Sequence, residues 1–151
     1  MSKPESPAET TPTFPHRDEQ GRVADLQQWL GYVAASVVIG FGLLAIVDVV
    51  VSLFNWGTFG NTNGWVSAIL AAFLFADDFK HNRFRSSRWS AMALALLLGI
   101  AAMIAASLIL PPWPPLFAGG AAALVGALTY AWAWFAGVRA LGYDIEEKKT
   151  S

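Results

Sequence analysis

Long apolar runs separated by short polar segments dominate the pattern of this chain. Between Trp29 and Ala76 the only charged residue is Asp48, and between Trp89 and Gly137 there is none. Apolar runs of about 20 residues are typical of bilayer-spanning helices, because about 30 Å of hydrocarbon needs that length at 1.5 Å per residue. The pattern therefore predicts an all-α integral membrane protein.

The apolar runs predict four transmembrane helices. The segment 111–115 (PPWPP) cannot be helical throughout, so it separates the last two helices in a tight hairpin. The second helix is the weakest, since the apolar run 65–76 covers only about 18 Å of helix. To cross the membrane it needs part of the polar segment 57–64, and a re-entrant loop is the alternative. The predicted spans are about 29–54, 58–76, 89–110 and 116–138.

The positions of the basic residues distinguish these two topologies. Four crossings place every Lys and Arg on one side, which the positive-inside rule identifies as the cytoplasm. A re-entrant second segment would move the basic loop at 80–88 to the outside. We therefore predict a four-transmembrane-helix bundle with both termini in the cytoplasm. The ten basic residues are Lys3, Arg17 and Arg22 before the first span, Lys80, Arg83, Arg85 and Arg88 between the second and third, and Arg139, Lys148 and Lys149 after the fourth.

The polar ends divide the chain into three parts. Residues 1–21 are rich in Pro, Glu and Thr and predict a disordered cytoplasmic tail, because they cannot bury enough apolar surface to offset ordering. Residues 22–143 form the predicted transmembrane domain, and 144–151 a charged cytoplasmic tail. The first apolar run is too long for a signal peptide, so it should stay attached. The Ala-, Gly- and Trp-rich composition is typical of a bacterial protein, which indicates the inner (plasma) membrane.

The composition excludes several kinds of chemistry. Only 14% of the residues are charged and 55% are hydrophobic, whereas soluble domains carry about 25% charged residues. The absence of cysteine excludes disulfides, thiolate metal sites and thiol catalysis. The two histidines, His16 and His81, lie outside the spans and cannot hold a haem between them. With no phosphate-binding loop or nucleophile motif either, we predict no enzyme activity, no catalytic, cofactor or metal residues, and no cofactor.

Asp48 is the most informative single residue. It lies about 27 Å along the first helix from Leu30, and thus in the outer part of the membrane. An intramembrane acid costs about 2.5–3.5 kcal/mol at mid-bilayer and usually faces protein or water. No Lys, Arg or His lies inside a predicted span to pair with it. We predict a partner or ion contact at Asp48, with a hydrated acid near the outer interface as the alternative.

The loop 77–89 carries the second group of candidate residues. Basic side chains beside a membrane attract anionic lipid headgroups at about 1 kcal/mol per charge, which predicts headgroup contacts for Lys80, Arg83, Arg85 and Arg88. Asp77 and His81 alone are too few for a metal site, and the loop is too short for a nucleic-acid-binding module. The expected partners are therefore membrane lipids and other membrane protein subunits, with no nucleic acid and no identifiable soluble substrate.

Aromatic and small residues complete the pattern. Small residues four apart, Ala102 with Ala106, Gly119 with Ala123 and Ala122 with Gly126, let helix backbones approach closely, and we expect them to serve internal packing, with docking to another protein as the alternative. Trp and Tyr side chains favour the headgroup level, so those near the predicted span ends should form belts. These are Trp29, Tyr32, Trp89, Trp132, Trp134 and Tyr143 at the inner ends, and Trp56, Trp65 and Trp113 at the outer ends.

Three functional hypotheses follow from these patterns. The leading one is a non-catalytic accessory, assembly or stabilising subunit of a larger bacterial membrane protein complex. It rests on the missing catalytic and redox residues and on the intramembrane acid Asp48. The alternative is a small oligomeric ion- or proton-coupled transporter that uses Asp48. A membrane enzyme whose site follows no known pattern is the third.

Overall fold

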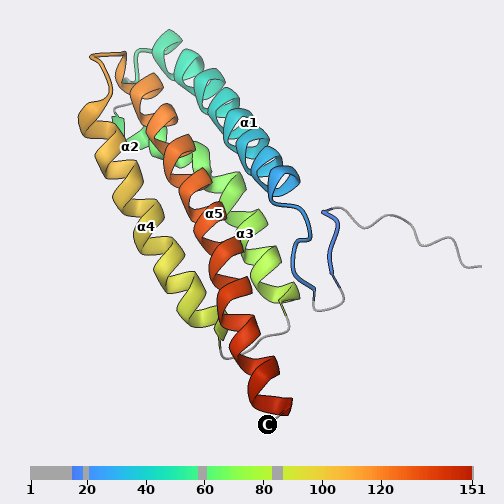
Figure 1. The fold of residues 1–151 in the computed structure, drawn as a ribbon. Helices are drawn as coiled ribbons and strands as arrows, with labels where there is room; N and C mark the ends of the chain where they lie inside the picture. The colour runs from blue at the N-terminus through green and yellow to red at the C-terminus, as the bar shows by residue number, and fades with distance from the viewer. Residues whose placement is uncertain (1–14, 19–20, 58–60, 83–86, 151) are drawn as a thin grey trace, which may run out of the picture.

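Helices form the fold in the computed structural model, which describes residues 15–18, 21–57, 61–82 and 87–150 (Figure 1). The described residues contain no strand, only an isolated antiparallel bridge between Arg17 and Val23. The predicted all-α class is thus confirmed. The elements are α1 (Leu26–Leu53), α2 (Asn61–Gly64), the 3-10 helix η1 (Trp65–Ala68), α3 (Ile69–His81), α4 (Ser87–Ile109) and α5 (Pro115–Thr150).

Three helical segments are long and apolar enough to cross a membrane. They are Leu26–Leu53, Arg88–Ile109 and Pro115–Ala140. These segments coincide with the first, third and fourth predicted spans and indicate a membrane protein. The backbone of α5 stays helical through Thr150, so the predicted charged tail at 144–151 begins as part of this helix.

The second predicted span corresponds to α2, η1 and α3, which follow one another without a break over 61–81. Residues 58–60, where the prediction began, lie outside the described residues. At about 1.5 Å per α-helical and 2.0 Å per 3-10 residue, this segment is about 34 Å long. Figure 1 shows it running back along α1, so that α1, α3, α4 and α5 alternate in direction.

This alternation brings the two ends of the described chain together. The segment before α1, the end of α3, the start of α4 and the C-terminal part of α5 lie at one end of the bundle (Figure 1). We call it the termini end and define it by residues 15–18, 21–25, 77–82, 87–88 and 139–150. The α1–α2 and α4–α5 connections lie at the opposite end.

Helix α5 is the centre of the bundle because its small side chains let its neighbours approach. It packs against α4, α1, α2 and η1. A Cβ atom on Gly126 would lie 2.9 Å from the backbone oxygen of Gly99 in α4, and one on Gly64 would lie 2.7 Å from the Cα of Gly119. Ala122 and Ala123 are fully buried. The expected internal packing of these small residues is confirmed.

The fully buried residues of helix α1 all lie in its first half. The Asp25 side chain caps its N-terminus by accepting a hydrogen bond from the Gln27 N–H at 2.8 Å. A Cβ atom on Gly40 would overlap the backbone oxygen of Ser67 in η1, so this crossing requires glycine. Beyond it no residue of 41–53 is buried. The buried residues of α1 recur every three or four positions and are Trp29, Val33, Val37 and Gly40.

The end of the predicted disordered tail is an ordered segment in the structure. Residues 15–18 and 21–25, the N-terminal strap, form a turn in which the Ala24 N–H donates to the His16 carbonyl at 2.8 Å. Val23 is buried against the bundle. The predicted tail at 1–21 overlaps this segment at 15–18 and 21, where a charged contact of Arg17 described below holds the chain against the bundle. The rest of that prediction, for 1–14 and 19–20, lies outside the described residues.

Candidate functional site

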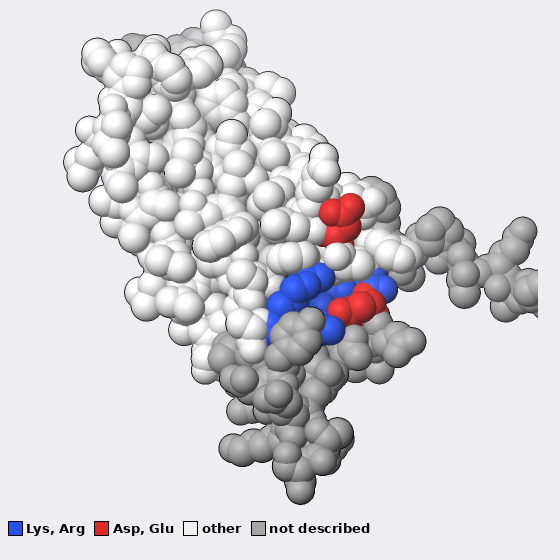
Figure 2. Space-filling view, in the orientation of Figure 1, with Lys and Arg blue, Asp and Glu red and all other residues white. Residues whose placement is uncertain are grey.

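Charged side chains gather at the termini end. Figure 2 shows blue and red residues at this end of the face in view, while the rest of that face is almost entirely white. Among the charged side chains that the structure describes, all except Asp48 belong to the strap, to the last turn of α3, to the start of α4 or to α5 at Arg139. Two separate polar sites result, one around Asp78 and one at Asp48.

Asp78 is the centre of a buried ionic cluster. It is 3% exposed, in the last turn of α3. The Arg17 guanidinium of the strap pairs with its Oδ1, and the Trp134 ring N–H of α5 donates to its Oδ2 at 2.6 Å. Arg17 also lies 3.6 Å from the Asp77 carboxylate. A buried carboxylate is tolerated where charge and hydrogen-bond partners surround it, and here both of its oxygens are occupied.

Further hydrogen bonds order the strap and fasten it to the bundle. Within the strap, Arg17 donates to the Gly21 carbonyl at 3.1 Å. Arg139 of α5 donates to the Val23 carbonyl at 2.7 Å and lies over the Phe135 ring at 3.5 Å from its centroid. The cluster thus joins the strap, α3 and α5. Because its polar atoms bond to one another, its chemistry suits a structural clamp.

The sequence analysis did not identify this cluster. It treated Trp134 and Trp29 as interfacial belt residues, but both are buried, Trp134 on Asp78 and Trp29 in an edge-on contact with Phe75. The sequence feature that could have indicated the cluster is the pair of acids at the end of an apolar run, Asp77 and Asp78. The belt interpretation agrees with the exposed positions of Trp56, Trp89, Trp113 and Trp132.

The structure places two of the four predicted headgroup residues. Lys80 is exposed at the end of α3. The Arg88 guanidinium lies 4.5 Å from the centroid of the Phe79 ring and donates to the Phe79 carbonyl at 3.3 Å. Both cations therefore flank the last turn of α3. Arg83 and Arg85 lie outside the described residues.

The Asp77–His81 pair lies on the same turn of α3. The His81 Nδ1 is 3.4 Å from the Asp77 carboxylate and 2.8 Å from the Asp77 carbonyl. Within the part of the chain that the structure describes, no group of three or more His, Cys, Asp or Glu residues is placed to hold a metal ion. This pair acts as a local contact within one helical turn.

Asp48 lies in the half of α1 that the bundle leaves exposed. Its side chain is half-buried, and its neighbours Val47 and Val49 are exposed. This position is near the C-terminal end of α1, at the opposite end of the bundle from the Asp78 cluster (Figure 1). The structure therefore separates the one predicted intramembrane acid from the other charged residues that it describes.

Comparison with known proteins adds no relative. No protein-family model, curated protein or solved structure matches this chain. Function is therefore inferred from the distribution of charged and apolar side chains over the fold.

Proposed function

We propose that this chain is a non-catalytic accessory subunit of a larger complex in the bacterial inner membrane, and that residues 41–53 of α1 carry its partner surface. The observation that supports this role is the end of full burial at Gly40, although the Phe41 ring still contacts Phe117 of α5. Beyond Gly40, large apolar side chains are exposed around the half-buried Asp48. These are Leu43 (55% exposed), Ile46 (63%), Val49 (57%) and Leu53 (78%).

Asp48 distinguishes this surface from an ordinary lipid-facing one. Exposed Leu, Ile and Val side chains pack equally well against lipid tails and against another helix, so they alone favour neither environment. Asp48 lies on the half-buried side of α1, turned away from Leu43 and Ile46, and an acid there favours protein or water over lipid. A partner helix that covers this part of α1 would add a charge-assisted hydrogen bond, worth about 1.5–3 kcal/mol, to the interaction that Asp48 already makes within the chain.

The proposed orientation has four crossings and both termini in the cytoplasm. The 61–81 segment is about 34 Å long measured along its own path, and α2 turns across the bundle before α3 runs along it (Figure 1), so the proposed crossing requires this bend to be covered by α1 and α5. The basic residues Arg17, Arg22, Lys80, Arg88 and Arg139 all belong to the termini end, which the positive-inside rule assigns to the cytoplasm. Asp48 then lies in the outer part of the membrane.

Single-cysteine labelling tests the orientation, because the native chain has no cysteine. In intact cells, a membrane-impermeant maleimide is expected to label Asn61→Cys and Trp113→Cys but not Ser2→Cys or Ser151→Cys. All four should react after permeabilisation, which controls for accessibility. Labelling of residue 151 from outside intact cells would exclude the four-span orientation.

Co-purification tests the subunit role. Extraction in a mild detergent is expected to yield a stoichiometric foreign membrane protein with the native chain. Asp48→Asn should weaken that association about 10- to 100-fold while the chain stays folded, since a contact worth about 1.5–3 kcal/mol is lost. Ile46→Trp should weaken it by steric conflict. The matched control is Leu97→Trp on α4, where the native side chain is 68% exposed on another surface.

The transporter alternative gives a different result in the same experiment. The chain would be extracted as a homo-oligomer, Asp48→Asn would leave the assembly intact, and pH-dependent ion flux in liposomes would be lost, because an amide cannot release a proton. An unchanged partner association in both Asp48→Asn and Ile46→Trp would exclude residues 41–53 as the partner surface.

A further inference from the structure

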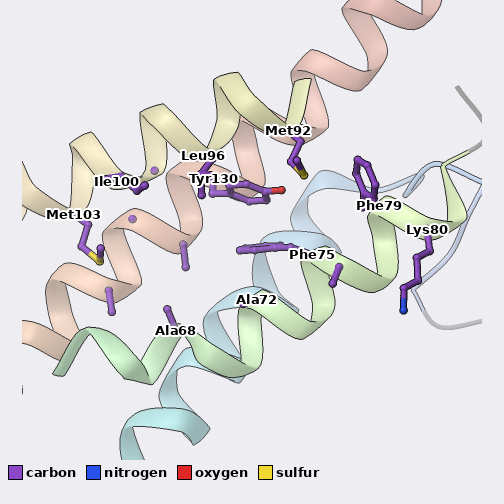
Figure 3. A pocket seen from close by; sticks show the side chains of 15 residues that line it. Ala68, Ala72, Phe75, Phe79, Lys80, Met92, Leu96, Ile100, Met103 and Tyr130 are labelled. Carbon is purple, nitrogen blue, oxygen red and sulfur yellow. The ribbon is translucent and has the colours of Figure 1, made fainter. Parts of the chain in front are cut away.

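A second surface feature lies on the other side of α3. A groove of about 550 Å³ runs between α3 and the α4–α5 pair (Figure 3). Its lining is almost wholly apolar. The α5 side is formed by small residues and by the Tyr130 ring, and rings and thioethers from α3 and α4 project from the sides. The lining residues include Phe75, Met92, Met103, Ala123, Gly126 and Ala127.

The groove exists because α3 diverges from α4 and α5. Gly64, the last residue of α2, lies against Gly119 of α5. Helix α3, which follows α2 and η1, packs mainly on α1. Across the gap, the Phe75 ring reaches Tyr130 at 4.1 Å between centroids. Small residues of α3, Ala72 and Ala76, leave the remaining space open and are themselves exposed. The groove is thus accessible from the side of the bundle, where lipid tails lie in the proposed orientation.

The length of the groove fits one leaflet. From Ala68 to Lys80, both of which line it, the chain rises about 18 Å. One leaflet contributes about half of the 30 Å hydrocarbon thickness, or about 15 Å. An extended acyl chain of that leaflet matches this length, and the apolar lining suits it.

The end of the groove nearest the termini is cationic. Lys80 stands at this end in Figure 3. The Arg88 guanidinium covers the ring of Phe79, another lining residue, at 4.5 Å. Two cations therefore lie where the hydrocarbon of a leaflet ends and the headgroups begin, and basic residues at this level attract anionic headgroups.

We propose that this groove binds an anionic phospholipid of the leaflet on the termini side, with an acyl chain between α3 and the α4–α5 pair and the phosphate at Lys80 and Arg88. The proposal depends on membrane insertion with the termini end at one surface. It requires no partner subunit. Failure of the co-purification experiment would therefore leave it unaffected.

Native mass spectrometry of the purified full chain tests the proposal, with dioleoylphosphatidylglycerol and dioleoylphosphatidylcholine as probes. The anionic lipid should be retained about 30-fold more strongly, which corresponds to about 1 kcal/mol for each of the two cations near the phosphate. Lys80→Gln should reduce this preference to about fivefold because Arg88 remains, and Ala72→Phe should reduce retention of both lipids by filling the groove. Lys3→Gln and Ala101→Phe are the matched controls for charge and for an exposed alanine of α4 outside the groove, and neither should change retention.

Three outcomes would overturn the proposal. One is equal retention of the two lipids by the native chain, and another is equal retention by Ala72→Phe and Ala101→Phe. The third is a homodimer that Ala72→Phe dissociates, which would assign the groove to a second copy of the chain. Circular dichroism and gel filtration establish that each variant is folded, and Ala76→Phe replaces Ala72→Phe if the latter is not.

Discussion

Replacing Arg17 by alanine is expected to lower the free energy of unfolding in detergent by about 3 kcal/mol, because removing one partner of a buried ion pair leaves an uncompensated charge. The Asp78 side chain is 5% exposed and the Arg17 side chain 14%, so water replaces the lost guanidinium poorly. The Trp134 N–H would be the remaining partner among the contacts described above. Denaturant unfolding monitored by tryptophan fluorescence measures the change.

A deletion of residues 2–14 is the control for this variant. It removes most of the polar tail and keeps Arg17, so stability should stay within about 0.5 kcal/mol of the native value. The double variant Arg17→Ala with Asp78→Asn should be less destabilised than the sum of the single changes, since the pair interacts directly. Additive effects of the two substitutions would show that the ion pair does not hold the strap.

The second large effect is expected at Gly40. Gly40→Ala should lower the stability by about 3 kcal/mol, because the new Cβ atom would overlap a backbone oxygen of η1, which cannot rotate away. Gly42→Ala is the matched control, two residues along the same helix with nothing within 4 Å of the added Cβ. It should be neutral or raise the stability by about 0.5–1 kcal/mol, because alanine is a better helix former than glycine.

Thermal unfolding of both variants in the same detergent measures this difference. The two alanine variants add the same methyl group and differ only in the atoms that this group meets. Equal stabilities of Gly40→Ala and Gly42→Ala would be incompatible with the close approach of α1 and η1.

The lengths of the apolar runs were sufficient to predict three of the helices, because a membrane-spanning helix needs about 20 consecutive apolar residues. The weak second helix needed more information. Its apolar run at 65–76 is short, and the structure continues the helix through Asp78 to His81. The polar residues at this end remain helical where the strap and α5 provide partners for Asp78. Such partners are tertiary contacts, which no local pattern contains.

The two polar sites also differ in whether a local sequence pattern reveals them. Asp48 could be identified from the sequence, since a single charge in an apolar run is a local anomaly. The Asp78 cluster could not, because Arg17 lies 61 residues and Trp134 56 residues away along the chain. Their meeting depends on helix directions and on the side of α5 that faces α3. Trp134 has the same local surroundings as a belt residue, and only its buried partner reveals its role.

The hydrogen bond from Arg139 to the Val23 carbonyl joins residues 116 positions apart. During translation the N-terminal strap therefore emerges from the ribosome long before α5 can reach it, since synthesis proceeds at about 5–20 residues per second. Until Arg139 has been made, Val23 lacks this contact. Of the strap contacts described above, those of Arg17 with α3 can already form. The full attachment of the strap is thus a late event that requires the whole of α5 up to Arg139.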